Sequence, residues 1–325
     1  YILKQLRELG DERFFESIRP LLKHPSPAVR TAAVHNLYFY KQYPIPEEVK
    51  PLIQDSEQAV KVAAFNYLIE HSPENRVELI SRFLEDSDYR VSCAALVSLA
   101  SETRGNPELK EVFQLEEKIR QKLAGLPDIE NAKEQQFTKV QVLKAIGEAN
   151  MPVLQPILAF FLADESPEVS RQAIQSAGQT LNPDFINPLI GFLSDETYRP
   201  AAQAALAHYG TGIIGALQKF VDQAASGEVV VIRHLPPIVE GMDDQSAVQF
   251  LFSLLDYEDL VVRLEALRSL NTLKNRFPHL KFQKKDLLQQ ILEEAKLYQN
   301  TLSVLYIQAK SAEAEPEQSE SRRAR

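Results

Sequence analysis

A 31-residue spacing of small and branched apolar residues constrains the fold more than any other feature of this sequence. Val29, Ala33 and Leu37 stand four residues apart, which places them on one stripe of an α-helix. The same triplet recurs after 31 residues and again after 62, as Val60, Ala64, Leu68 and as Val91, Ala95, Leu99. A period of about 20 to 50 residues is typical of units that bury their apolar faces only by stacking on copies of themselves.

Five further triplets keep the same spacing after one insertion of 16 residues. They are Thr138, Val142, Ile146; Val169, Ala173, Ala177; Pro200, Ala204, His208; Val231, Leu235, Val239; and Val262, Ala266, Leu270. An apolar run and an Asp-rich turn precede most triplets, so each unit is predicted to hold two helices, with the triplet on the second. Ser26-Pro27 and Ser166-Pro167 place a favoured N-cap residue before a proline at the first helical position.

The pattern of an apolar helix, an Asp-rich turn and Val-Arg-x-x-Ala-x-x-x-Leu resembles the HEAT-repeat (armadillo-like) family of α-solenoids. Val29-Arg30, Val60-Lys61 and Val262-Arg263 carry the resemblance, which spans about residues 11–272. It implies an all-α fold: a right-handed α-solenoid of about eight two-helix repeats, whose second helices line the concave side.

The segments around these repeats give the expected domain organisation. Residues 1–10 read as the tail of a truncated preceding repeat, and a chain that begins at Tyr1 inside a repeat suggests a piece of a longer protein. The insertion lies within residues 101–137 and predicts a lengthened first helix followed by a long loop. Residues 273–310 are expected to form a C-terminal helical cap, and 311–325 a disordered tail. Pro236-Pro237 falls inside a predicted second helix and is expected to kink it.

Composition and motifs argue against several function classes. A net charge of −9, from 36 basic and 45 acidic residues, disfavours a nucleic-acid partner. No His pair has metal-ligand spacing, and no phosphate loop or Gly-x-Ser-x-Gly elbow occurs, so we expect no enzyme, no metal and no cofactor. Cys93, the single cysteine, is expected to pack in a helix interface. Without an apolar run of about 18 residues, this segment is expected not to insert into a membrane and to be cytoplasmic.

Helix geometry predicts where a binding surface would lie. Positions −1, +3, +6 and +10 from the first anchor of each triplet lie opposite the packed stripe. In the middle repeats the candidate concave-face residues are Gln141, Lys144, Gln172, Gln175, Gln179, Arg199 and Gln203. This strip is either a solvated face or a groove that hydrogen-bonds an extended peptide or another domain of the parent chain.

A second candidate is an aromatic patch of Tyr38, Phe39, Tyr40 and Tyr43, which serves either as core filling or as a recognition surface.

Two functional hypotheses remain from the sequence. The first is a non-catalytic protein-interaction or scaffold module. The second rests on Arg263–Asn271, Arg276–Leu280 and Glu293-Glu294-Ala295, with Ile232–Pro236 in addition, which together look like the HEAT segment of bacterial membrane proteins with an ATP/ADP-translocase-like domain. That resemblance implies a structural or regulatory part on the cytoplasmic side, tethered by a parent membrane domain.

Overall fold

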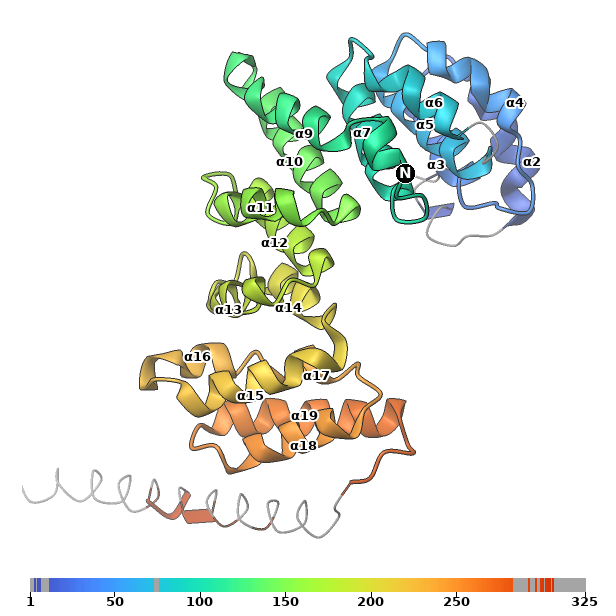
Figure 1. The fold of residues 1–325 in the computed structure, drawn as a ribbon. Helices are drawn as coiled ribbons and strands as arrows, with labels where there is room; N and C mark the ends of the chain where they lie inside the picture. The colour runs from blue at the N-terminus through green and yellow to red at the C-terminus, as the bar shows by residue number, and fades with distance from the viewer. Residues whose placement is uncertain are drawn as a thin grey trace, which may run out of the picture. The chain divides into compact units, whose positions relative to one another are not determined.

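The computed structural model describes residues 12–72 and 76–282, together with residues 3, 5 and 6 and scattered positions between 292 and 306. These described residues form helices and connecting turns and contain no β-strand, so the all-α prediction is confirmed for them (Figure 1). The chain divides into two compact units, residues 1–209 and 210–325. The predicted cap and tail fall mostly outside the described residues, as does most of the predicted truncated repeat in residues 1–10.

The described residues of unit 1 form thirteen α-helices with short 3-10 helices between them. The α-helices are α2 (Phe15–Ile18), α3 (Pro27–Leu37), α4 (Pro46–Val49), α5 (Gln58–His71), α6 (Arg76–Leu84), α7 (Tyr89–Glu102), α8 (Leu109–Val112), α9 (Leu115–Ala124), α10 (Ala132–Ala149), α11 (Gln155–Phe161), α12 (Pro167–Thr180), α13 (Ile186–Gly191) and α14 (Arg199–Ala207). The 3-10 helices are η1 (Glu12–Phe14), η2 (Arg19–Lys23), η3 (Lys50–Gln54), η5 (Leu126–Asp128), η6 (Pro152–Leu154), η7 (Pro183–Phe185) and η8 (Phe192–Ser194).

Unit 2 continues with helices of similar length. They are η9 (Gly210–Ile213), α15 (Ile214–Gln223), η10 (Ser226–Glu228), α16 (Val229–Ile232), α17 (Pro236–Val239), α18 (Gln245–Ser253), η11 (Leu254–Asp256) and α19 (Leu260–Arg276). Helix α19 packs on α17, α18 and η11. Across the described residues, no helix is both long enough and apolar enough to cross a bilayer.

The triplet-bearing helices of unit 1 pack in sequence order. Helix α3 contacts α5, α5 contacts α7, α7 contacts α10, α10 contacts α12, and α12 contacts α14. Each also contacts the shorter helix or helices before it, as α6 does with α7 and α11 with α12. The anchors form the core between them, because every anchor from Val60 to Leu99 and from Thr138 to Ala177 is at most 3% exposed. Seven of the eight triplets are buried as predicted, with Val29 only half-buried.

The sixth triplet was predicted in the wrong register. Pro200, Ala204 and His208 are exposed, whereas Ala201 and Ala205, one residue later, are at most 5% exposed. Helix α14 begins at Arg199, which puts Pro200 in the first turn, where its missing N–H leaves no hydrogen bond unmade. The core positions therefore shift by one residue, and His208 falls beyond the end of the helix.

Three further local predictions are corrected. Pro236-Pro237 does not kink one helix but begins the short helix α17, and three residues separate it from α16, which ends at Ile232. The lengthened helix of the insertion is broken at Gln114, whose φ is 48°. Ser26 and Ser166 occupy N-cap positions before prolines as predicted, but their side chains make no cap hydrogen bond.

The basic residue of the Val-Arg motif links one helix pair to the next. The Arg30 guanidinium pairs with Asp55, in the turn before α5, at 2.7 and 2.8 Å. It also donates to the carbonyl oxygens of His24 and Pro25, at the end of the helix before its own. Lys139 makes the corresponding contact with Asp164 at 2.9 Å. The motif therefore ties neighbouring pairs together at one end of the second helices.

Candidate functional site

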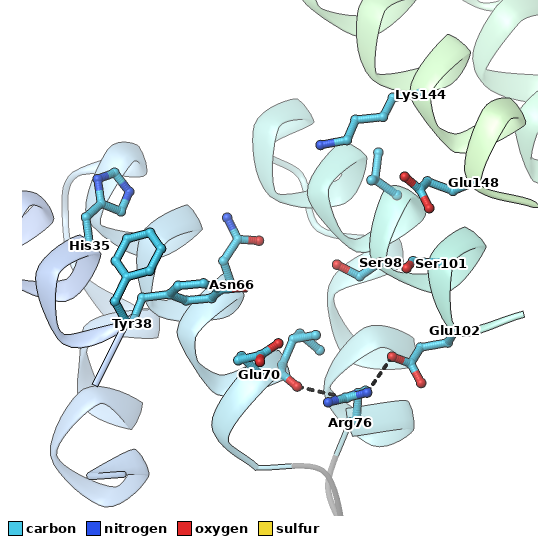
Figure 2. Close-up of a pocket in the computed structure, with 13 residues that line it drawn as sticks. His35, Tyr38, Asn66, Glu70, Arg76, Ser98, Ser101, Glu102, Lys144 and Glu148 are labelled. Carbon is cyan, nitrogen blue, oxygen red and sulfur yellow. Dashed lines mark hydrogen bonds and ion pairs between the residues drawn. The ribbon is translucent and has the colours of Figure 1, made fainter. Parts of the chain in front are cut away.

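A cavity of about 580 Å³ opens along the second helices of the first four helix pairs (Figure 2). Its walls come from α3, α5, α7 and α10, with Arg76 added by the first turn of α6. The cavity therefore runs past these helices in the order in which they pack on one another. The lining residues are His35, Tyr38, Phe39, Asn66, Ile69, Glu70, Arg76, Val97, Ser98, Ser101, Glu102, Lys144 and Glu148.

The lining residues recur at fixed positions on the four helices. Each helix contributes the residues six and ten positions after its first anchor. These are His35 on α3 and Phe39 in the turn after it, Asn66 and Glu70 on α5, Val97 and Ser101 on α7, and Lys144 and Glu148 on α10. Because the anchors are buried, these positions face away from the core, and the stacked helices align them into one groove.

An aromatic pair forms the α3 side of the groove. The rings of Tyr38 and Phe39 meet edge to face with centroids 5.4 Å apart, and Phe39 is 55% exposed. Tyr38 also lies edge-on to His71, whose Nε2 is 2.9 Å from the Tyr38 carbonyl oxygen. Burial raises the pKa of the Tyr38 hydroxyl, and the charge of Glu70 raises it further. The hydroxyl therefore stays protonated at neutral pH and is available as a donor.

The three carboxylates of the groove are each neutralised by a cation from a neighbouring segment. Lys41 bonds Glu70 at 2.7 Å and lowers the pKa of that carboxyl. Arg76 bonds Glu102 at 2.7 Å and also donates to the Ile69 carbonyl oxygen.

Further along the groove, Arg104 lies 3.3 Å from Glu148. Lys144, on the same helix as Glu148, is exposed and forms no ion pair with any described residue. The groove thus offers aromatic surface, an amide at Asn66, hydroxyls at Ser98 and Ser101, and one unneutralised cation.

The predicted concave-face residues separate in the structure. Lys144 lines the groove, whereas the other six do not appear in its wall. Gln172 donates to Ser176 on its own helix, and Arg199 donates to the carbonyl oxygens of Leu193 and Ser194. The remaining four comprise one exposed residue, Gln175, and three half-buried residues, Gln141, Gln179 and Gln203.

The four residues of the predicted aromatic patch lie in two different places. Tyr38 and Phe39 line the groove. Tyr40 is 2% exposed and packs edge-on to Phe15, and the Tyr43 ring is tilted against the same Phe15 ring with centroids 5.4 Å apart. Core filling therefore describes Tyr40, and a recognition surface at Tyr38 and Phe39 stays a prediction.

Most lining residues that were not predicted lie at the same positions, +6 and +10 from the first anchor, that gave Lys144. The prediction used these positions only in the middle repeats. The same count from Val29, Val60 and Val91 gives lining residues on or next to α3, α5 and α7. Arg76, by contrast, carried no signal, because it precedes a first helix and enters the groove through packing.

A second cavity of about 350 Å³ lies beside the insertion, between the start of α7 and helices α9 and α10. Lys122 crosses it and donates to Ser92 at 2.9 Å, and Lys118 pairs with Glu85. Cys93 neighbours this region and is fully buried, as predicted, and burial raises the pKa of its thiol. The described residues hold no group of three His, Cys, Asp or Glu side chains arranged to bind a metal ion.

Comparison with known proteins gives no family. The chain matches no protein-family model, and no curated protein matches it either. Among solved structures it is similar to an engineered protein from the Northeast Structural Genomics Consortium, with 18% identity and a TM-score of 0.26. The similarity covers 81% of this chain and 97% of that chain. At this TM-score it supports no conclusion about fold or function.

Proposed function

We propose that the chain is a non-catalytic protein-interaction module, and that the groove along α3, α5, α7 and α10 binds an extended segment of a partner protein or of the parent chain. The single observation that carries the proposal is the periodic lining of this groove by successive second helices. In this proposal the helix pairs form a HEAT-like α-solenoid, and the groove is part of its concave side.

The chemistry of the groove suits a peptide. Phe39 offers a half-exposed ring as an anchor for an apolar side chain, and aromatic anchors contribute much of the energy at protein interfaces. Asn66 is exposed and carries both donor and acceptor groups, which match the alternating N–H and C=O groups of an extended backbone. Lys144 supplies a charge that is free to meet a carboxylate.

Glu70, the groove carboxylate paired with Lys41, is suited to binding rather than proton transfer. The hydrogen bond from Lys41 lowers the pKa of the Glu70 carboxyl and so stabilises its charged form. A general acid needs the opposite environment, one that holds the proton near neutral pH. The groove therefore fits recognition better than acid–base catalysis.

A displayed library of linear peptides, selected on the full chain, tests the proposal. Enriched peptides are measured by fluorescence anisotropy against the wild type and against Phe39→Ala and Lys144→Ala. Loss of a buried anchor costs about 2 kcal/mol at a hot spot, so we expect roughly a thirtyfold weaker Kd for Phe39→Ala. Lys144→Ala should weaken binding of peptides with acidic residues.

Matched controls come from the same unit. Tyr43→Ala removes an aromatic ring of similar exposure outside the groove, and Lys133→Ala removes an exposed lysine from the other end of α10. Neither should change Kd. Equal binding by all four variants, or selection that enriches no peptide, would refute the groove as the binding site.

A further inference from the structure

Helices α3, α5, α7, α10 and α12 of unit 1 each bury a second face beside the triplet. The residue five positions after the first anchor lies on that face, away from the triplet itself. In α3, α5, α7, α10 and α12 these residues are at most 1% exposed, namely Val34, Phe65, Leu96, Leu143 and Ile174. Each of these helices contacts the next one in the chain, which explains the burial.

The equivalent face of α19 lacks such a neighbour among the described residues. Leu267, five positions after the anchor Val262, is only half-buried. Leu260 and Leu264 lie on the same face, because the three residues are spaced by four and three positions. They are 57% and 43% exposed, so α19 presents a leucine stripe to solvent.

The described positions after α19 also expose large apolar side chains. Between residues 287 and 306, the described positions Leu292, Leu302 and Tyr306 are helical, and they are 61%, 48% and 68% exposed. At about 100° per residue they fall within about 80° of one another around a helix. The sequence adds further apolar residues to the same side: Leu288, Ile291, Ala295, Tyr298 and Leu305.

We propose that residues 287–306 dock as an antiparallel helix on the leucine stripe of α19. Residues 277–286 form a ten-residue connection, which reaches at most about 33 Å, while α19 is about 25 Å long. The segment therefore has enough chain to turn back and lie along α19. The two stripes then bury each other, as neighbouring second helices do in unit 1.

The covalent connection favours residues 287–306 as the partner of the α19 stripe over a second copy of the chain or a lipid surface. A short flexible linker gives an effective concentration of the order of millimolar, far above that of a separate partner in dilute solution. Charge also fits at one position: Arg268, which pairs with Glu265 on its own helix, lies eight residues before the end of α19, and Glu294 lies eight residues after the connection.

Amide hydrogen exchange of the full chain tests the docking. We expect amides of residues 290–304 to exchange at least about tenfold more slowly than in a synthetic peptide of the same residues. Leu264→Asp should remove that protection, because it places a charge on the stripe. Val112→Asp, at another exposed apolar residue on α8, should leave the protection unchanged.

A crosslink tests the arrangement independently. Leu264 lies twelve residues before the end of α19, and Tyr298 lies twelve residues after the connection, so they should face each other. The double variant Leu264→Cys, Tyr298→Cys, treated with a short bismaleimide, should give an internally crosslinked monomer. Cys93 is fully buried and should not compete for the reagent.

Three results would overturn the proposal. Crosslinked dimers, with protection that grows with protein concentration, would identify a second copy as the occupant. Protection only in the presence of phosphatidylglycerol vesicles would identify a lipid surface. Unprotected amides under all these conditions would show that the stripes do not pair.

Discussion

A close approach between α12 and α14 gives a sharp test of the packing in unit 1. Gly178 is buried on α12, against α14. A Cβ atom placed on it would lie 2.6 Å from both Cα and Cβ of Ala205 and 2.8 Å from the Ala205 carbonyl oxygen. Carbon atoms pack at about 3.5 to 4.0 Å, so Gly178→Ala forces the two helices apart by about 1 Å.

The expected effect follows from two opposing terms. Overpacking of a tight interface costs about 1 to 3 kcal/mol, and the upper half applies here because backbone atoms cannot rotate away. Replacing a helical glycine by alanine gains about 0.8 to 1 kcal/mol. We therefore expect Gly178→Ala to lower the free energy of unfolding by about 1 to 2 kcal/mol.

Urea denaturation, followed by circular dichroism because the chain lacks tryptophan, measures this change. Gly191→Ala is the matched control in the same unit, since a Cβ there meets nothing within 4 Å. It should stabilise the unit by up to about 1 kcal/mol. If Gly178→Ala stabilises the unit as Gly191→Ala does, the close approach of α12 and α14 is wrong.

Three other predictions follow from single contacts. The hydrogen bonds from Arg30 lower the pKa of Asp55. The pair therefore stabilises the fold above the ordinary carboxyl pKa of about 3.9, and this contribution is lost as pH falls through the lowered pKa. Asp55→Asn should make the free energy of unfolding less dependent on pH in this acid range. Burial raises the pKa of Tyr209 to about 12, so the free energy of unfolding should fall between about pH 10 and 12. Tyr209→Phe should remove this fall, and it should cost about 1 kcal/mol at neutral pH because it removes the hydrogen bond to the Asn182 carbonyl oxygen. Cys93 is fully buried, so iodoacetamide should modify it only after urea opens unit 1, and modification in buffer at the rate of a free thiol would contradict its position.

The sequence predicted the helix pairs well because their main requirement is local. A small residue such as Ala33 or Ala64, between two larger apolar residues one turn away on each side, defines the buried stripe of a helix without any knowledge of its partner. The error at Pro200 has the same origin. A strict spacing of 31 residues ignores the preference of proline for the first turn of a helix. Helix α14 begins at Arg199, which places Pro200 in that turn and moves the buried positions by one residue.

The groove was predictable in position but not in chemistry. Counting six and ten residues from each anchor identifies Phe39 and Asn66 as lining residues. No count shows that Glu102 is neutralised by Arg76, which comes from the preceding helix, α6, because that pair depends on how the helices pack. Likewise, the sequence does not show that Lys144 forms no ion pair with a described residue, because this depends on which cations pair with the neighbouring carboxylates.

The ion pairs between neighbouring helix pairs have a mechanical consequence. Arg30–Asp55 joins α3 to the turn before α5, and Lys41–Glu70 joins the turn after α3 to α5. A pulling force along the stack would pass through such contacts one interface after another. The same interfaces hold apolar contacts between successive triplet-bearing helices, as between α3 and α5, so the force would have to part both kinds of contact at each interface. The ion pairs therefore add to the resistance that each interface offers to extension.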